Sequence, residues 1–304
     1  MIGMGFVRDL LTNPSRSSKK GTTLPDLNDV VADINRTHGF AFRVEYRFDS
    51  GMQQGAWRLR GSDCRRAVLK FSRDRSVEDL RRLPDAIDLL RKNDYPTPAW
   101  FAVGVAEFPY YVQEFLDGIP STPLTAAKIP LLLDILERQA GLNPAPHIDA
   151  NAGIRRTIVD GPDRTVRALG AQGERLVDDL VRLLDRHGPI DLPGGDLVHG
   201  DFNSCNILLD RGTVAGIIDI EAMGSGTRVI DYACLLREAY VEDYGPAVTD
   251  AIRAAAEPIA GPAALALCVA ATAYDIVQFK RQHQPERLDH TITRLRDLAR
   301  DLTP

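Results

Sequence analysis

Apolar and polar residues alternate from Phe40 to Phe48, where aromatic or apolar side chains occupy every second position. A period of two is typical of a β-strand that buries one face. Two further strands are predicted at Gly55–Arg60 and Arg66–Phe71, and a flexible connection over 49–55 joins the first two strands. The pattern therefore indicates a small sheet in the N-terminal part of the chain.

Helical periodicity lies on both sides of this sheet. Apolar residues recur at helical spacing over 26–37, after an Asp that suits an N-cap and before Gly39 as a stop signal. A mainly helical stretch is predicted at 76–92, interrupted or restarted at Pro84. Strand character then returns at 96–116, so further strands are expected there.

The second half of the chain has a different pattern. Helices are predicted over 123–142, 163–187 and 229–304, and two short buried strands at 206–209 and 214–220 interrupt them. The predicted fold class is therefore α+β, with a small β-rich lobe followed by a larger, mainly helical lobe.

These patterns divide the chain into three parts. Residues 1–25 are predicted to be a mobile leader, because the stretch within them from residue 12 is polar and punctuated by Pro, Ser and Gly. Residues 26–117 form the predicted N-lobe, which would bind a nucleotide. Residues 118–304 form the predicted C-lobe, with the catalytic loop and helices for an acceptor.

Composition narrows the possible partners. The 304 residues carry a formal net charge of −5, which argues against non-specific binding to nucleic acid or to an anionic membrane and is compatible with a cationic ligand. No signal peptide is apparent, and no stretch approaches the roughly 18–20 apolar residues of a membrane span. Four cysteines lack zinc-site spacing, so free thiols in the cytoplasm are expected.

The strongest chemical signal lies in the segment from Leu197 to Leu209, where Asp201 and Asn206 are five residues apart and precede an apolar strand. The catalytic loop of protein kinases has the same spacing. Such a reaction needs a carboxylate that orients a hydroxyl and accepts its proton, and an amide oxygen that holds Mg²⁺. Asp201 suits the first role and Asn206 the second.

A second carboxylate, Asp219, ends an apolar strand at the position of the metal-holding Asp of the kinase D-F-G segment. Hard oxygen ligands suit Mg²⁺, so Asn206 and Asp219 form a candidate metal pair. A lone Asp or Asn at a strand end is usually a turn or cap residue, but the three residues together favour chemistry. For His199 a structural role in the loop is favoured over catalysis.

These residues carry a resemblance to a known family. His-Gly-Asp-x-x-x-x-Asn-Ile-Leu, followed by Val-x-Gly-x-Ile-Asp and then Asp-Tyr-Ala, resembles the aminoglycoside phosphotransferase/choline kinase family over residues 197–236. The resemblance implies a bilobal protein-kinase-like fold. It also implies that Asp201 is the base, that Asn206 and Asp219 hold magnesium, and that Asp231 braces the loop.

The N-terminal part offers residues for a nucleotide, ATP or GTP. Lys70, within an apolar third strand, would reach the α and β phosphates. Glu78 in the next predicted helix would pair with it, with Asp85 as the alternative, because Pro84 leaves the helix register open. We expect two further groups of nucleotide-binding residues: Gly51 and Gly55 in the turn that would cover the phosphates, and Glu114 and Leu116 in the segment that resembles the family's hinge.

Other nucleotide motifs are missing from the sequence. No Gly-Lys dipeptide occurs, which excludes a Walker A loop. Gly224-Ser225-Gly226 lacks a third glycine and is interpreted as a loop. The turn at 49–55 also lacks a full G-x-G-x-x-G pattern and is compatible with an ordinary hairpin connection.

The acceptor is predicted to be a small molecule. Asp231 follows Asp219 by only twelve positions, which is too short for the activation loop of protein kinases. Acidic residues of the C-terminal helices are available for a cationic acceptor, although such residues usually form a solvated face. These candidates are Glu238, Glu242, Asp243 and Asp275.

The function that we predict is Mg²⁺-dependent transfer of the γ-phosphoryl group of ATP or GTP to a hydroxyl. The resemblance implies an antibiotic as the acceptor, of aminoglycoside or cationic peptide type, and hence resistance by O-phosphorylation. Two alternatives stay open: a metabolite kinase for choline, an amino alcohol or a sugar, and a non-catalytic nucleotide-binding protein. The protein is expected to be a cytoplasmic monomer or homodimer without nucleic-acid or membrane partners.

Overall fold

The computed structural model describes residues 26–48, 55–72, 75–159, 163–187 and 190–303. The predicted leader, 1–25, lies outside these residues. The described chain forms two compact units, one of residues 26–120 and 207–221, the other of residues 121–206 and 222–303. A β-rich N-terminal region and a helical C-terminal region confirm the predicted fold class.

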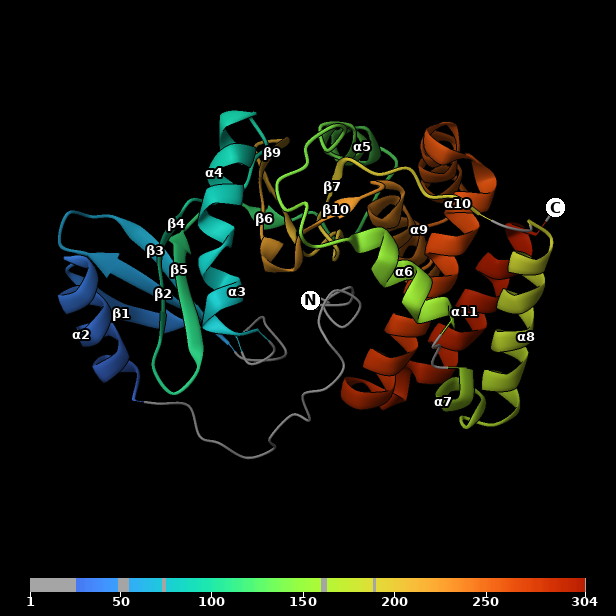
Figure 1. The fold of residues 1–304 in the computed structure, drawn as a ribbon, viewed down its shortest axis with the longest axis horizontal. Helices are drawn as coiled ribbons and strands as arrows, with labels where there is room; N and C mark the ends of the chain where they lie inside the picture. The colour runs from blue at the N-terminus through green and yellow to red at the C-terminus, as the bar shows by residue number, and fades with distance from the viewer. Residues whose placement is uncertain (1–25, 49–54, 73–74, 160–162, 188–189, 304) are drawn as a thin grey trace. The chain divides into compact units, whose positions relative to one another are not determined.

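A five-stranded antiparallel sheet is the centre of the first unit, in the order β1-β2-β3-β5-β4 (Figure 1). The strands are β1 (Phe42–Arg47), β2 (Ala56–Gly61), β3 (Arg66–Phe71), β4 (Trp100–Val105) and β5 (Pro109–Glu114). The three strands predicted between residues 40 and 71 are therefore confirmed, and the predicted strand region at 96–116 is a pair of antiparallel strands.

Helix α2 (Leu27–His38) precedes the sheet and contacts β1 and β4. Its predicted caps are confirmed: Oδ1 of Asp26 accepts the N–H of Asn28 at 2.8 Å, and Gly39 has a φ of 70°. Glycine takes this left-handed conformation without the steric cost that a Cβ would add. The helix shares a core with the sheet through its buried residues Val30, Val31 and Ile34.

Two helices, α3 (Val77–Arg81) and α4 (Leu83–Lys92), occupy the region predicted as one helical stretch. Pro84 lies in the first turn of α4, where a backbone N–H has no partner within the helix and its loss therefore costs little. The predicted restart of the helix at this proline is confirmed.

A three-stranded sheet brings a distant segment into the first unit. Strand β6 (Ile119–Pro120) pairs with β8 (Ile207–Asp210), and β8 pairs with β9 (Thr213–Ile217). The N–H of Ile217 also donates to the carbonyl of Pro96 at 2.6 Å. Because of this backbone pairing, residues 118–120 and 207–221 group with the first unit, whereas the predicted division assigned every residue after 117 to the C-lobe.

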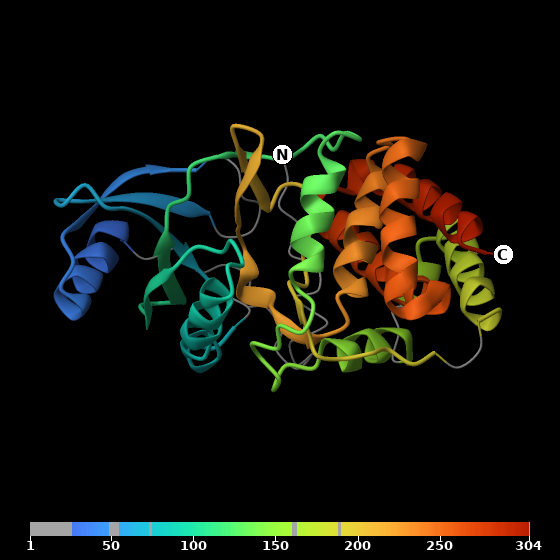
Figure 2. The ribbon, with the colours of Figure 1, turned by 90° about the horizontal axis from the view of Figure 1, so that it is seen from above.

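The second unit is mainly helical. It contains α5 (Ile129–Glu137), α6 (Ala150–Val159), α7 (Asp163–Arg167), α8 (Ala171–Asp185), α9 (Val229–Val241), α10 (Pro246–His283) and α11 (Leu288–Asp301). Short 3₁₀ turns occur at Ile220–Ala222 and Pro285–Arg287. Helices α9, α10 and α11, coloured orange to red, lie side by side in both views (Figures 1 and 2).

A short sheet lies beside these helices. Strand β7 (Asp196–Val198) pairs antiparallel with β10 (Gly224–Gly226), so the interpretation of 224–226 as a loop is wrong. Gly226 is needed for close packing, because a Cβ there would lie 2.7 Å from Oδ1 of Asn151. The segment is a strand because tertiary pairing, rather than local strand propensity, determines its conformation.

Helix α10 carries many apolar residues. It is long and apolar enough to cross a membrane by length and composition, which corrects the expectation that no stretch comes near this limit. Gly261, with a φ of 83°, breaks its helical geometry, and 67% of its apolar window is buried inside the fold. Packing in the core therefore accounts for its apolar character.

Candidate active site

The predicted catalytic loop connects β7 to β8, and its central carboxylate is held from both sides. The side chain of Asn203 donates to Oδ1 of Asp201 at 2.9 Å, and that of Asn206 donates to Oδ2 at 3.0 Å. Asp201 is 3% exposed. Two amide donors in a buried setting fix the rotamer of the carboxylate, and a carboxylate oxygen has two lone pairs, so it can accept more than one hydrogen bond.

Asn206 uses only one end of its amide in this arrangement. Its Nδ2 also donates to the backbone carbonyl of Asp201, at 3.0 Å. The nitrogen is therefore turned toward Asp201, and Oδ1 is the atom of Asn206 suited to a hard cation such as Mg²⁺. The chemistry of this side chain fits the predicted metal role.

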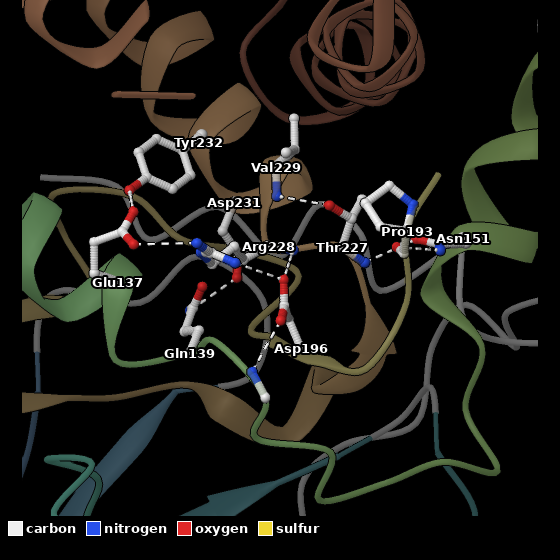
Figure 3. Close-up of polar contacts among 11 residues, drawn as sticks. Glu137, Gln139, Asn151, Pro193, Asp196, Thr227, Arg228, Val229, Asp231 and Tyr232 are labelled. Atoms are coloured by element: carbon white, nitrogen blue, oxygen red, sulfur yellow. Dashed lines mark hydrogen bonds and ion pairs between the residues drawn. The ribbon is translucent and has the colours of Figure 1, made fainter. Parts of the chain in front are cut away.

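Asp231 contacts the start of the catalytic loop from α9. Its carboxylate accepts the backbone N–H groups of His199 at 2.7 Å and Gly200 at 2.9 Å, together with the amide of Gln139 at 3.0 Å. Figure 3 shows the contact with Gln139. Burial raises the pKa of Asp231 to about 7, and the three donors oppose this shift. Asp231 thus occupies the bracing position that the resemblance implied.

The imidazole of His199 is buried and acts within the loop. Its Nδ1 accepts the N–H of Asp201 at 3.2 Å, and its ring packs edge-to-face on Phe202 with centroids 6.1 Å apart. Both contacts of the imidazole are with residues of the loop, as a structural role for His199 requires.

A polar network holds the elements on which the loop depends (Figure 3). Asp196 of β7 accepts the N–H of Gly141 at 2.9 Å and Nη1 of Arg228 at 3.0 Å. Arg228, at the start of α9, donates in turn to Glu137 at 3.1 Å, and the hydroxyl of Tyr232 donates to the other oxygen of Glu137. The network ties α5, β7 and α9 together.

The first unit brings together two of the predicted nucleotide-site residues. Nζ of Lys70, on β3, forms an ion pair with Oδ1 of Asp219, which follows β9. Their side chains are 17% and 32% exposed, so the pair is partly accessible. Asp219 has a φ of 63°, a conformation that is uncommon for a residue with a Cβ and is often found at functional sites.

Glu78 and its alternative, Asp85, are not brought to Lys70. Both are exposed, on α3 and α4, and no ion pair joins either of them to Lys70 within the described residues. The register of α3 explains the position of Glu78: Leu80 is fully buried, and a residue two positions earlier points to nearly the opposite side of the helix. Among the described residues, Lys70 pairs with the carboxylate of Asp219.

The other predicted nucleotide-binding residues have mixed outcomes. Gly51 lies outside the described residues, whereas Gly55 precedes β2 with a φ of 77°. The side chain of Glu114 accepts Nη1 of Arg91 at 3.0 Å and the N–H of Ala99 at 3.1 Å. The backbone N–H of Glu114 donates to the carbonyl of Ala99 at 2.7 Å, so this group is also engaged within the fold.

Leu116 packs against Gly216 of β9, where an added Cβ would overlap Cδ1 of the leucine. We expect Gly216→Ala to lower the free energy of unfolding by about 1–3 kcal/mol, as overpacking does, and to weaken nucleotide binding through the displaced Leu116. Thermal melts and ATP-analogue titrations would measure both effects. Gly194→Ala is the matched control, since a Cβ there meets no atom within 4 Å; equal behaviour of the two variants would contradict the prediction.

The four acidic candidates for the acceptor do not form one group. Glu242 pairs with Arg287 at 2.9 Å, and Asp243 pairs with Arg294 at 2.8 Å. Glu238 is buried, which raises its pKa, while donors of the catalytic loop lower it. Asp275 is half-buried on α10. Across the described part of the chain, no three His, Cys, Asp or Glu side chains gather as a metal site.

Several residues of the site were missed from the sequence. Two of them belong to the catalytic loop: Asn203 donates to Asp201, and Ser204 donates to Glu238. The third, Gln139, donates to the brace, Asp231. An Asn two positions after the catalytic Asp could have been found, because Asn readily caps nearby backbone and carboxylate groups. Gln139 and Ser204 meet their partners only through the tertiary fold.

Comparisons with known proteins agree with this geometry. Residues 46–268 match the phosphotransferase enzyme family. No curated protein sequence matches the chain. Solved structures with a similar fold include a thermostable mutant of the aminoglycoside phosphotransferase APH(4)-Ia in a ternary complex with ADP and hygromycin B. The two chains share 15% identity with a TM-score of 0.61, over 91% of this chain and 98% of that one.

Two other antibiotic phosphotransferases share the fold. The macrolide 2′-phosphotransferase MphH from Brachybacterium faecium has a TM-score of 0.55 and 16% identity, over 86% of this chain and 98% of that one. The aminoglycoside-3′-phosphotransferase of type VIII has a TM-score of 0.51 and 22% identity, over 90% of this chain and 98% of that one. At these identities the likeness concerns the fold.

Proposed function

Because the chain belongs to the phosphotransferase enzyme family, we propose that it transfers the γ-phosphoryl group of ATP or GTP to a hydroxyl of a small molecule. One observation carries this proposal: a buried carboxylate, Asp201, is oriented by two amide side chains in a loop with kinase spacing. Such preorganisation suits a group that must orient a hydroxyl during phosphoryl transfer, where positioning supplies most of the catalysis.

In the proposed reaction, Asp201 accepts a hydrogen bond from the acceptor hydroxyl and then its proton as the oxygen attacks the γ-phosphorus. The bond between that phosphorus and the bridging oxygen breaks, and the nucleoside diphosphate leaves. General-base catalysis of this kind contributes about 10²–10⁴-fold. His199 and Asp231 hold the backbone from which Asp201 projects.

The nucleotide would be bound by residues of the first unit. Lys70 supplies a positive charge for phosphate oxygens, and its ion pair with Asp219 holds the ammonium beside a carboxylate suited to a metal. The backbone carbonyl of Glu114 and the backbone of Leu116 would bind the base, since the N–H of Glu114 already donates to Ala99. Asp219 in the first unit and Oδ1 of Asn206 in the second are each suited to Mg²⁺, which would offset the negative charge of the phosphates.

The proposed acceptor is an antibiotic. Support comes from the structural relatives, of which one holds hygromycin B and others are named as aminoglycoside or macrolide phosphotransferases. The arginine partners of Glu242 and Asp243 mean that a cationic acceptor would have to displace an existing ion pair to reach either carboxylate. The panel that tests the acceptor should therefore extend beyond strongly cationic antibiotics.

The test is a direct search for phosphorylated product. The purified chain would be incubated with Mg²⁺ and ATP or GTP against aminoglycosides, macrolides, cationic peptide antibiotics, amino alcohols and sugars, with mass spectrometry of each acceptor. We expect an antibiotic to gain one phosphoryl group and to do so only with nucleotide and Mg²⁺. Phosphorylation of choline or a sugar alone would favour the metabolite kinase, and no product with any class would contradict the proposal.

A further inference from the structure

Helix α9 presents two carboxylates to the catalytic loop. Asp231 and Glu238 are seven residues apart, which is close to two helical turns and places them on the same face of the helix. We infer that Glu238 is a second positioning residue of the proposed phosphotransferase reaction, holding the loop after Asp201 as Asp231 holds it before Asp201. This inference rests on the proposed function and assigns Glu238 a different role from the acceptor contact suggested by its sequence.

The contacts of Glu238 converge on one residue of the loop. Oε2 accepts the backbone N–H of Ser204 at 2.8 Å, and Oε1 accepts the hydroxyl of the same residue. Ser204 is fully buried and lies between Asp201 and Asn206 in the chain. A carboxylate that binds both donors of one residue fixes the position and the orientation of that residue, because charge-assisted hydrogen bonds are short and strong.

The remaining polar group of Ser204 is also held. Its carbonyl accepts the backbone N–H of Ser121 at 3.0 Å and the hydroxyl of Ser121 at 2.9 Å. All three polar groups of Ser204 thus have partners from outside the loop. The loop has little freedom at Ser204. The contacts of Glu238 and Ser121 with Ser204, called the clamp below, would hold Asp201 and Asn206, on either side of it, in a constant geometry.

A direct contact between Glu238 and an acceptor fits the structure less well. The residue is 8% exposed, and the hydroxyl of Tyr244 also lies 3.5 Å from Oε1. Tyr244 in turn lies 3.3 Å from the hydroxyl of Thr122. The carboxylate is therefore surrounded by donors of the protein itself, and an acceptor would have to displace one of them.

The loop start and the loop middle are therefore fixed to the same helix. Asp231 binds the N–H groups of His199 and Gly200, and Glu238 binds Ser204, so α9 acts as a rigid support for both segments. Loss of one support should let the Asp201 carboxylate sample unproductive positions. Since small misplacements of a catalytic group slow a reaction strongly, kcat should suffer more than KM.

Two variants separate the positioning role from an acceptor-binding role. Glu238→Ala removes both acceptors, whereas Glu238→Gln keeps an oxygen for the N–H of Ser204 and an amide that can donate to its hydroxyl. We expect Glu238→Ala to lower kcat about 10–100-fold with KM for the acceptor changed less than about threefold. Glu238→Gln should retain most of the activity. If Glu238 bound a cationic acceptor, both variants would raise KM.

Amide hydrogen exchange tests the clamp without any acceptor. In Glu238→Ala, peptides covering residues 199–206 should exchange at least about tenfold faster than in the wild type, while peptides of α8 stay unchanged. Ser204→Ala should give an intermediate effect, and it serves if Glu238→Ala does not fold. Glu257→Gln, an α10 carboxylate paired with Arg253 at 2.6 Å, is the matched control.

The outcomes distinguish a failure of the proposed phosphotransferase function from a failure of the positioning role of Glu238. If the wild type phosphorylates no acceptor yet Glu238→Ala loosens residues 199–206, the proposed function fails and the clamp remains. If exchange in Glu238→Ala and Ser204→Ala equals that of the wild type, or if both Glu238 variants raise KM with kcat unchanged, the inference is overturned. The inference would be supported if Glu238→Ala shows fast exchange over residues 199–206 and a lowered kcat, while Glu238→Gln retains most of the activity.

Discussion

Asp201→Asn is expected to lower phosphoryl transfer by about 10²–10⁴-fold while the chain still binds ATP. The amide cannot accept a proton from the acceptor hydroxyl, and its NH₂ would face one of two amide donors, from Asn203 or Asn206. Lys70 and Asp219 belong to the other compact unit, so their ion pair should persist in the variant. Initial rates with an acceptor that the wild type phosphorylates would measure the loss of transfer. Titration with a non-hydrolysable ATP analogue would measure nucleotide binding.

A matched control for this variant is Asp185→Asn, which makes the same chemical change at an exposed position near the end of α8. It should retain wild-type rates. If Asp201→Asn transfers phosphate as fast as the control, then Asp201 is not the base, and the central role of the catalytic loop in the proposed function is wrong. Loss of ATP-analogue binding together with activity would instead indicate that the variant has lost its fold.

Local chemistry explains which parts of the fold were predictable. The caps of α2 and the restart of α4 depend on Asp26, Gly39 and Pro84, whose preferences act within one turn of the chain. The alternation over 40–48 likewise reports a strand with one buried face. Such signals belong to the residues themselves and do not need the rest of the structure.

Features that depend on long-range pairing were predicted poorly. Strand β10 consists of Gly224, Ser225 and Gly226, which have low strand propensity, and it exists because β7 pairs with it. Residues 207–221 join the first unit because β8 pairs with β6. No local pattern in these segments encodes the partner.

The candidate site shows the same division. The spacing of Asp201 and Asn206 is readable because both serve one short loop, and the structure places their side chains in direct contact. The sequence offers Glu78, with Asp85 as the alternative, as the partner of Lys70, but both are exposed, and the burial of Leu80 turns Glu78 to the solvent. Contacts between side chains that are distant in the sequence depend on which face of its helix or strand each residue occupies. A shift of one residue in a strand moves its side chains to the opposite face.

The stability of the protein should depend on pH through Asp231. Its pKa is about 7 in the folded chain, against an ordinary value of 3.8, because burial disfavours the charged form. Between about pH 4 and pH 7 the folded state therefore binds more protons than the unfolded state, and the contribution of this group to stability is lost as the pH rises through that window. The thiols of Cys234 and Cys268 have pKa values raised by burial and stay neutral in this range.

Asp231→Asn removes this titration. We expect the variant to be less stable than the wild type by roughly 1–3 kcal/mol at pH 5, because an NH₂, unlike the hydroxyl oxygen of the protonated carboxyl, cannot accept a hydrogen bond from His199, Gly200 or Gln139. The difference should shrink by about 2–3 kcal/mol by pH 8, since only the wild type loses stability as the carboxyl ionises.

Denaturant unfolding of both proteins at pH 5 and pH 8 measures this double difference, and Asp185→Asn again controls for removal of an exposed carboxyl. A stability difference that stays the same from pH 5 to pH 8 would show that the folded pKa of Asp231 is not raised, so that its three donors offset burial.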